Sequence, residues 1–142
     1  MKPINTMKLI LESRSVNESF ARSAVSAFAA QLDPTVEEIS DIKTAVSEAV
    51  TNCIVHAYRD MPGKIYITCE IYENGLFRTK IRDCGCGISD VKKAMEPLFT
   101  TAGEERAGLG FAVMESFTDK LRVRSAFGKG TTVTLEKHIS GR

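Results

Sequence analysis

The chain has 142 residues, 43% hydrophobic and 26% charged, and its 19 basic against 18 acidic residues leave a net charge of +1. This length suits one domain that buries roughly two thirds of the surface of its unfolded chain. A charge near zero creates no overall field toward nucleic acid or anionic lipid. The N-terminus lacks a signal-peptide pattern, and no apolar run approaches the roughly 20 residues of a membrane span. We therefore expect a cytoplasmic protein with no direct nucleic acid or membrane partner.

The four cysteines follow neither a paired zinc spacing nor the framework of a small disulfide-rich protein. They are Cys53, Cys69, Cys84 and Cys86. Cys84-Gly85-Cys86 is the one segment that could bind a metal or form a redox pair, but two ligands make a poor structural zinc site. We expect reduced thiols that act as small apolar fillers.

The N-terminal half predicts a short strand and two amphipathic helices. Apolar residues alternate over residues 7–11, which indicates the strand, and recur at helical spacing over residues 15–31 and 35–53. Both helices begin with the pattern of a capping box, in which a hydroxyl and a carboxylate three residues apart satisfy free backbone N–H groups. The two pairs are Ser15 with Glu18, and Thr35 with Glu38.

The C-terminal half predicts strands and a further helix. Strands over 65–71 and 77–83 form a hairpin around Asn74-Gly75, and Asp83 has the parity of Ile81, so its carboxylate should point to the same face. The rest is a short helix after Ser89, an unpatterned stretch over 98–108, a helix from Gly110, and strands over 121–126 and 131–138. These elements predict an α/β two-layer sandwich over residues 1–142, with a mixed, mainly antiparallel sheet and helices on one face.

Two polar residues share one face of the second predicted helix. Glu48 and Asn52 are four residues apart, and Ala45 and Ala49 keep the neighbouring side chains short. An Asn carbonyl is an oxygen ligand suited to magnesium, and a carboxylate one turn away can accept a proton from an attacking hydroxyl. Taken alone, such a pair is more often two solvated polar residues on a helix than a functional site.

A glycine-rich turn follows the strand that ends at Asp83. In Asp83-Cys84-Gly85-Cys86-Gly87-Ile88, a carboxylate that only accepts hydrogen bonds precedes two residues without Cβ. Such an acid can accept from an adenine amino group while the backbone approaches the flat base. A tight turn alone would explain the same residues.

Two further segments extend this pattern. Gly108-Leu109-Gly110 opens a helix whose free N–H groups would face a phosphate, and the loop with Thr100, Thr101 and Arg106 indicates a lid over phosphates. The hydroxyls of Gly130-Thr131-Thr132 could join Asp83 around the base through water.

In this order, Glu48-Ala-Val-Thr-Asn52, Asp83-x-Gly85-x-Gly87 and Gly108-Leu-Gly110 resemble the nucleotide-binding boxes of the GHKL ATPase/kinase superfamily. The runs Asn17-Glu-Ser-Phe-Ala-Arg22, Gln31-Leu-Asp-Pro-Thr35 and Glu96-Pro-Leu-Phe-Thr-Thr101 resemble the sporulation anti-sigma F factors of spore-forming bacteria.

The resemblance implies a homodimeric protein-serine kinase that binds ATP or ADP with Mg²⁺. It would inhibit a sigma-F type sigma factor in its ATP form and phosphorylate an anti-anti-sigma factor on serine. Glu48 would be the catalytic base, Asn52 the magnesium ligand, and Glu18 and Arg22 the partner-binding residues. The residues expected around the nucleotide are Asn52, Asp83, Gly85, Gly87, Ile88, Thr100, Thr101, Arg106, Gly108, Leu109, Gly110, Phe111 and Thr132.

The sequence departs from the family pattern at Cys84 and Cys86, and it lacks the lysine that commonly follows Thr100-Thr101. Arg106 is the candidate to replace that charge, because a guanidinium can bridge phosphate oxygens. Three alternatives stay open: a stress-response anti-sigma kinase, a nucleotide-switched binding module with little kinase activity, and the ATP-binding half of a sensor histidine kinase. The last is disfavoured because no phosphoacceptor helix precedes the domain.

Overall fold

The computed structural model describes residues 2–58, 61–88 and 110–141. The elements in chain order are β1 (Asn5–Glu12), α1 (Val16–Ala29), η1 (Ala30–Leu32), α2 (Val36–Asn52), η2 (Cys53–Ala57), β2 (Lys64–Ile71), β3 (Leu76–Asp83), β4 (Lys120–Ala126) and β5 (Gly130–His138). Residues 110–116 form a further helix, as expected from Gly110. The helix predicted after Ser89 and the stretch over 98–108 lie outside the described residues.

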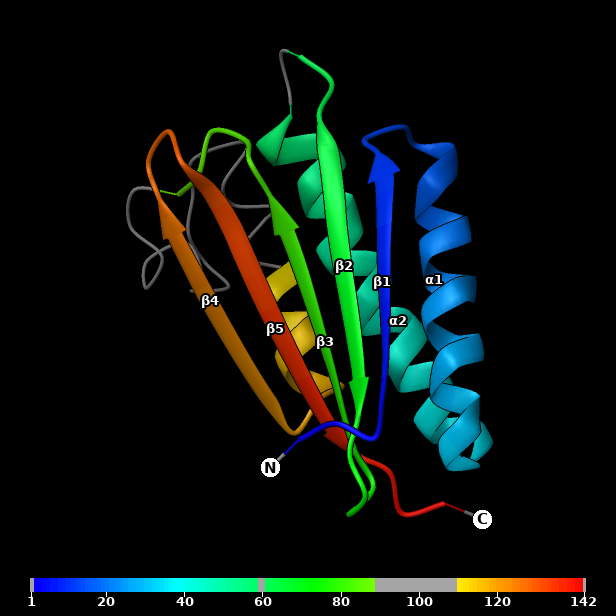
Figure 1. Cartoon of the computed structure of the whole chain (residues 1–142). Coiled ribbons are helices and arrows are strands. Elements are labelled where there is room, and N and C mark those ends of the chain that lie inside the picture. Colours follow the sequence, from blue (N-terminus) through cyan, green and yellow to red (C-terminus); the bar gives the residue numbers. More distant parts are fainter. Residues whose placement is uncertain (1, 59–60, 89–109, 142) are drawn as a thin grey trace.

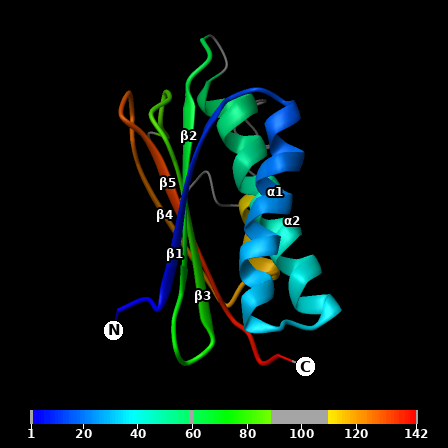
Figure 2. The same ribbon diagram turned by 45° about the vertical axis from the view of Figure 1, so that its right-hand side comes forward.

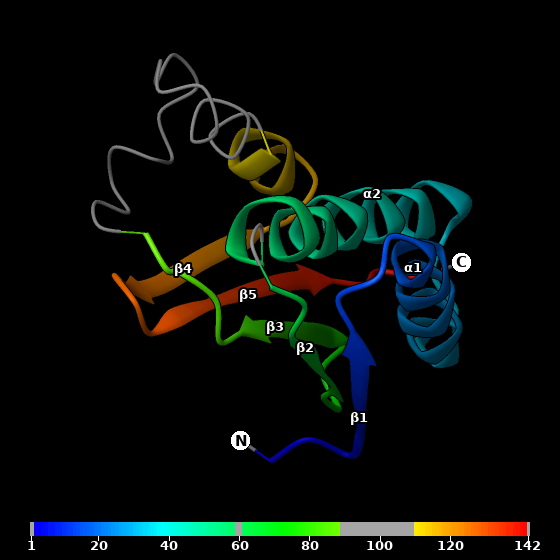
Figure 3. The ribbon, with the colours of Figure 1, turned by 90° about the horizontal axis from the view of Figure 1, so that it is seen from above.

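The five strands form one sheet in the order β1-β2-β3-β5-β4, and each of these four pairings is antiparallel. Figure 1 shows the strands side by side, and Figure 2 shows α1 and α2 packed on one side of them. Seen from above in Figure 3, the 110–116 helix lies on the same side as α1 and α2. The predicted two-layer sandwich with helices on one face is confirmed.

The core lies between the sheet and the helices because alternate strand residues point toward α2. The inward residues of β2 and β3 are all buried: Ile65, Ile67, Cys69, Ile71, Phe77, Thr79, Ile81 and Asp83. Val46 and Val50 of α2 are buried against them, and each such aliphatic side chain contributes about 1.5–3 kcal/mol by leaving water. Asp83 therefore ends a row of apolar residues, as its parity predicted.

The two capping patterns have different outcomes. Thr35 has extended backbone angles (φ −69°, ψ 165°), its hydroxyl accepts from the N–H of Glu38, and the box is complete. Ser15 is itself helical (φ −58°, ψ −32°) and makes no side-chain cap, so the predicted first box is wrong. The carboxylate of Glu18 instead accepts a hydrogen bond from the Ser47 hydroxyl of α2.

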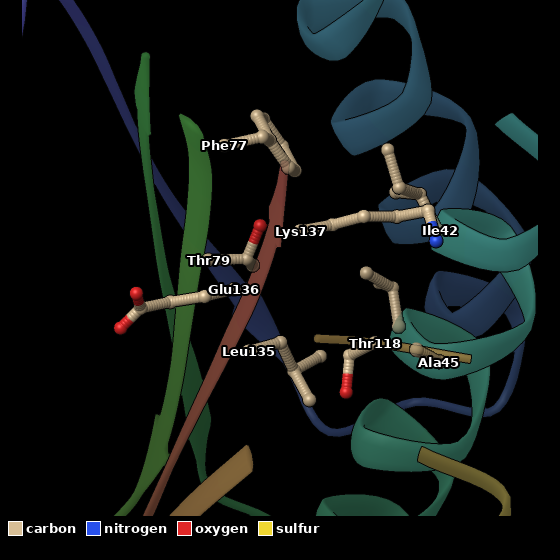
Figure 4. Close-up of a pocket in the computed structure, with 9 residues that line it drawn as sticks. Ile42, Ala45, Phe77, Thr79, Thr118, Leu135, Glu136 and Lys137 are labelled. Atoms are coloured by element: carbon tan, nitrogen blue, oxygen red, sulfur yellow. The ribbon is translucent and has the colours of Figure 1, made fainter. Parts of the chain in front are cut away.

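A small void lies beneath α2, where Ile42 and Ala45 face β3 and β5 (Figure 4). Its volume is ≈ 10 Å³, about the least that holds one water molecule. The ammonium of Lys137 lies 3.1 Å from a carboxylate oxygen of Asp41 and ties β5 to α2 at this level. The void is thus a packing defect and too small to be a ligand site.

Candidate functional site

Asp83 is fixed at the end of β3, between Ile65 of β2 and Thr131 of β5. Only 5% of it is exposed. Its Oδ1 accepts from the N–H groups of Gly85 (3.0 Å) and Thr131 (3.2 Å), and its Oδ2 accepts from the Cys53 thiol (3.6 Å). A carboxylate has about four acceptor positions, so this one retains capacity for a donor on a ligand.

Burial sets the protonation chemistry of this corner. It raises the pKa of Asp83 above its ordinary value, and the N–H of Gly85, the thiol of Cys53 and the N–H of Thr131 offset part of that rise. Burial, and then the charge of Asp83, raise the pKa of Cys53 well above its ordinary range. Cys53 is therefore a neutral thiol that donates a hydrogen bond and not a reactive thiolate.

The fold itself needs glycine at two positions in the turn after β3 and at the first residue of β5. Gly87 has φ +73°, and a Cβ there would lie 2.0 Å from the carbonyl oxygen of Ala126. Gly130 has φ +92°, and its Cβ would lie 2.2 Å from the carbonyl oxygen of Asp83. A Cβ on Gly85 would lie 2.3 Å from the carbonyl oxygen of Ala57. The absence of Cβ therefore lets three segments of backbone meet around Asp83, whether or not a base is bound.

The end of α2 contains a feature that the sequence analysis missed. Residues Cys53–Ala57 form the π-helix η2, where the prediction was a continuous α-helix to residue 53. The carbonyl oxygen of Ala57 accepts from the N–H of Cys86, and that of His56 accepts from the Cys86 thiol. Short π-helical turns are frequent at functional sites, and this one brings α2 to the turn after β3. Because the apolar stripe of α2 continues through Ile54, the sequence pattern does not distinguish this π-helical turn from one more turn of α-helix.

Glu48 and Asn52 lie side by side under the start of the 110–116 helix. A Cβ built on Gly110 would be 3.2 Å from Oε2 of Glu48 and 3.3 Å from both terminal atoms of the Asn52 amide. The amide nitrogen of Asn52 is buried and has no hydrogen-bond partner among the described residues. Rotation of the amide by 180° places its oxygen there instead. This position fits a ligand that offers either an acceptor or a cation.

The other residues that were predicted to surround the nucleotide lie in different environments. Phe111 is buried in the core, so only its backbone is available to a ligand, and the N–H of Ile88 already donates to Ser125. Thr132 pairs with Arg82 and lies on the outer face of the sheet, so its assignment beside Asp83 is wrong. Thr131 has that place because side chains alternate along β5. The following predicted residues lie outside the described part: Thr100, Thr101, Arg106, Gly108 and Leu109.

A polar groove between α1 and α2 leads to Glu48. Its volume is ≈ 420 Å³, and it is lined by Arg22, Ser23, Ser40, Lys43, Thr44, Ser47 and Glu48. The guanidinium of Arg22 lies 3.8 Å from the carboxylate of Glu18. Arg22 and Glu48 therefore line the same groove, and Glu18 contacts two of its lining residues, Arg22 and Ser47.

All four cysteines are free thiols, as expected. In the part of the chain that the structure describes, no three or more His, Cys, Asp or Glu residues are grouped to hold a metal ion, so Cys84 and Cys86 gain no further ligand. Within the same described ranges, no helix has the length and apolar character needed to cross a bilayer.

Residues 11–137 match the family model of the histidine kinase-like ATPase domain. The anti-sigma F factor of Caldanaerobacter subterraneus subsp. tengcongensis is 60% identical, over 95% of this chain and 94% of its own length. That of Geobacillus kaustophilus is 53% identical, over 96% of this chain and 94% of its own length.

Solved structures share the fold at lower identity. The RsbU and RsbW domains of a Mycobacterium tuberculosis protein align with a TM-score of 0.71 and 22% identity, over 96% of this chain and 33% of that one. A histidine kinase domain from Erythrobacter litoralis aligns with a TM-score of 0.57 and 20% identity, over 88% and 60%. Asp83 and the Glu48–Asn52 pair thus lie in a known ATPase fold, and the chain belongs to the anti-sigma F factor family within the histidine kinase-like ATPase domains.

Proposed function

We propose that this chain is a partner-switching anti-sigma factor and an ATP-dependent protein serine kinase. With ATP bound it holds and inhibits a sporulation sigma factor of the sigma-F type, and it phosphorylates an anti-anti-sigma factor on a serine. The names of its relatives support the sigma partner, and the GHKL-type fold supports the use of ATP. We place this activity in the cytoplasm, within one domain.

One observation carries the kinase assignment: Glu48 lies beside Asn52, whose amide nitrogen has no partner among the described residues, and Glu48 also lines the α1–α2 groove. Phosphoryl transfer depends mainly on positioning and charge stabilisation, which requires a base and a phosphate-side group at one place. The groove gives a protein segment access to Glu48 from the side of Arg22. A serine hydroxyl could therefore reach the base while ATP occupies the Asp83 side.

The residues would divide the chemistry as follows. Asp83 accepts a hydrogen bond from the adenine amino group through its free capacity. Glu48 accepts the proton of the substrate serine as the serine oxygen bonds to the γ-phosphorus, and the bond from that phosphorus to the bridging oxygen breaks to release ADP. Mg²⁺, when bound with the phosphates, supplies positive charge that neutralises them, and Asn52 would hold it through the amide oxygen. Thr100, Thr101, Arg106, Gly108 and Leu109 stay our candidates for phosphate contacts.

Two further assignments concern partners. Glu18 and Arg22 are our candidates for contact with the sigma factor and the anti-anti-sigma factor, because Arg22 lines the groove and Glu18 contacts its lining residues Arg22 and Ser47. We also assign a homodimer to the free edge of β1, which pairs only with β2 among the described strands.

The test is phosphorylation of the purified anti-anti-sigma factor with labelled ATP. Glu48→Gln keeps the shape of the side chain and should lower phosphoserine formation at least about 100-fold, because general-base catalysis is worth that much or more. Nucleotide-dependent binding of the sigma factor should persist. Glu73→Gln, at an exposed turn, is the matched control.

Phosphorylation by Glu48→Gln at the wild-type rate would remove Glu48 from the mechanism. If the wild-type chain forms no phosphoserine but binds sigma factor in a nucleotide-dependent way, it is a binding module. A pull-down in ATP and then in ADP identifies the sigma factor and separates the sporulation type from the stress-response type.

A further inference from the structure

The sheet face opposite the helices carries basic side chains that the net charge of +1 conceals. On this face β3 and β4 flank β5 (Figure 1), and their outward residues are in register across it. Arg82 and Arg124 lie on either side of Thr132, and Lys80 and Arg122 on either side of Thr134. We call these six residues the basic strip.

The strip is a groove with cationic walls and a hydroxyl floor. Neighbouring strands are about 4.8 Å apart, so the rows on β3 and β4 are separated by about 10 Å, and successive outward residues along a strand by about 7 Å. The four cationic residues are exposed, whereas Thr132 and Thr134 are half-buried between them. Lys80, Arg122, Arg124 and the two threonines line a groove with a volume of ≈ 350 Å³, and Arg82 lies in register with Thr132 at its end.

An acidic pair closes one end of the strip. The guanidinium of Arg78, next along β3, lies 3.5 Å from the carboxylate of Glu136 and 3.9 Å from that of Glu70. Figure 4 shows the Glu136 side chain pointing away from Leu135, toward this outer face. The charge of Arg78 is thus balanced, and the excess positive charge lies in the strip.

Within the strip the charges have no such balance. No ion pair among the described residues involves Lys80, Arg122 or Arg124. Two unit charges about 7 Å apart repel by roughly 0.6 kcal/mol even in water, and an anion between them reverses this cost. Four cations around two hydroxyl groups therefore form a site for repeated negative charge.

The chemistry of the strip indicates which anion. Protein interfaces bury an apolar centre. Among the described residues, no exposed large hydrophobic residue lies on β3, β4 or β5, the three strands that form this surface. Arg, Lys and Thr are the side chains that contact phosphates, and nucleic acid interfaces are polar and basic.

Arg82 adds a stacking surface at one end. Its guanidinium carbon lies 4.1 Å from the ring centre of Tyr66, so the guanidinium plane is already held by an aromatic ring. Unpaired bases stack on such planes, whereas the bases of a duplex are enclosed. We propose that the basic strip binds the phosphate backbone of single-stranded nucleic acid. This proposal revises the expectation drawn from the net charge, which cannot show how charge is distributed over the two faces.

The test is the binding of a fluorescent oligothymidylate of about 15 nucleotides, followed by anisotropy at several salt concentrations. Four phosphate contacts predict a slope of log K against log salt of about −3. Lys80→Glu with Arg122→Glu should weaken binding at least tenfold and lower the slope by about half. Lys2→Glu with Arg14→Glu, two exposed positions that lie in no strand and outside the strip, makes the same charge change and should keep most of the affinity. ATP binding, measured on all variants, should stay unchanged because the strip and the Asp83 carboxylate lie on opposite faces, and thermal denaturation shows that each variant is folded.

Three results would overturn the proposal. The first is equal oligonucleotide affinity in the Lys80→Glu/Arg122→Glu variant and the control variant. The second is equally tight binding of polyglutamate, which would make the partner an acidic protein. The third is binding of vesicles with anionic lipid but not of the oligonucleotide. Equal binding of duplex and single strand would overturn the role of Arg82 and Tyr66 in stacking. None of these results bears on the kinase proposal.

Discussion

The two ends of α2 are built in opposite ways. At its start, Glu38 accepts hydrogen bonds from the backbone of Thr35, Ser140 and Gly141, so this corner joins the helix to the C-terminal segment. At its end, the buried amide nitrogen of Asn52 has no partner among the described residues. Satisfied polar groups stabilise a fold, whereas a buried unpaired one costs about 1–3 kcal/mol. The start of α2 thus serves stability, and its end retains a cost that a ligand can remove.

The strongest test of this contrast is Asn52→Ala. We expect ATP affinity in the presence of magnesium to fall at least about 100-fold, equal to about 2.7 kcal/mol, because the residue assigned to hold Mg²⁺ beside the phosphates is lost. The free energy of unfolding without nucleotide should stay the same or rise, because a buried unpaired amide is removed from a helix. Calorimetric titration and urea denaturation measure both. Asn5→Ala, far from the site on β1, is the control, and a loss of stability without a loss of affinity would reverse our assignment.

Asp83→Asn should have the next largest effect. An amide in place of the carboxylate can present a donor to the adenine amino group, so we expect ATP affinity to fall about 30-fold, or roughly 2 kcal/mol. Unchanged ATP binding would exclude Asp83 as the adenine contact.

The same variant has a predicted pH signature. Because burial raises the pKa of Asp83, the folded state binds its proton more tightly than the unfolded state. This contribution to stability is full at low pH and is lost as pH rises through the raised pKa. Asp83→Asn should abolish that loss in urea denaturation at a series of pH values upward from about 4. Parallel pH profiles of wild type and variant would show that Asp83 is not desolvated.

Glu38→Ala should act on the other end of α2. We expect a loss of about 1.5 kcal/mol in the free energy of unfolding, with ATP affinity unchanged. Partial burial alone would raise the pKa of Glu38, but the hydrogen bonds from Thr35, Ser140 and Gly141 outweigh it and lower the pKa to about 2. The carboxylate of the wild type should therefore stabilise the fold fully above about pH 4.5 and progressively less toward pH 2. Glu37→Ala, at the exposed neighbouring residue, is the control. An equal loss in the free energy of unfolding there would show that the hydrogen bonds of Glu38 do not stabilise the fold.

The smallest expected effect compares the two helix starts. Thr35→Ala should cost about 1 kcal/mol, because it removes a formed cap. Ser15→Ala should change stability by no more than about 0.5 kcal/mol, because Ser15 makes no side-chain cap. Thermal denaturation of both variants measures the difference. An equal loss of stability in the two would show that Ser15 caps α1 after all.

The sequence predicted the fold well because the local patterns were clear. The alternation over residues 65–71 and 77–83 indicated which side chains point inward, and it placed Asp83 correctly at the end of a buried row. It predicted poorly where a neighbour in space competes with a local motif. Glu18 matched a capping box, but the Ser47 hydroxyl and Arg22 from other turns engage its carboxylate. Thr132 was misplaced by one residue, and in a strand one residue reverses the face.

By itself, the sequence determined the order of the elements, the parity of Asp83 and the shared helical face of Glu48 and Asn52, because periods of 2 and 3.6 residues are properties of the local backbone. Only the tertiary structure decided what those residues meet. Three features join segments that are distant in the chain. The π-helix Cys53–Ala57 meets the turn after β3, the carboxylate of Asp83 accepts from the N–H groups of Gly85 and Thr131, and Gly110 lies against Asn52. The basic strip has the same origin, because strand order and register assemble like charges that composition averages to nearly zero.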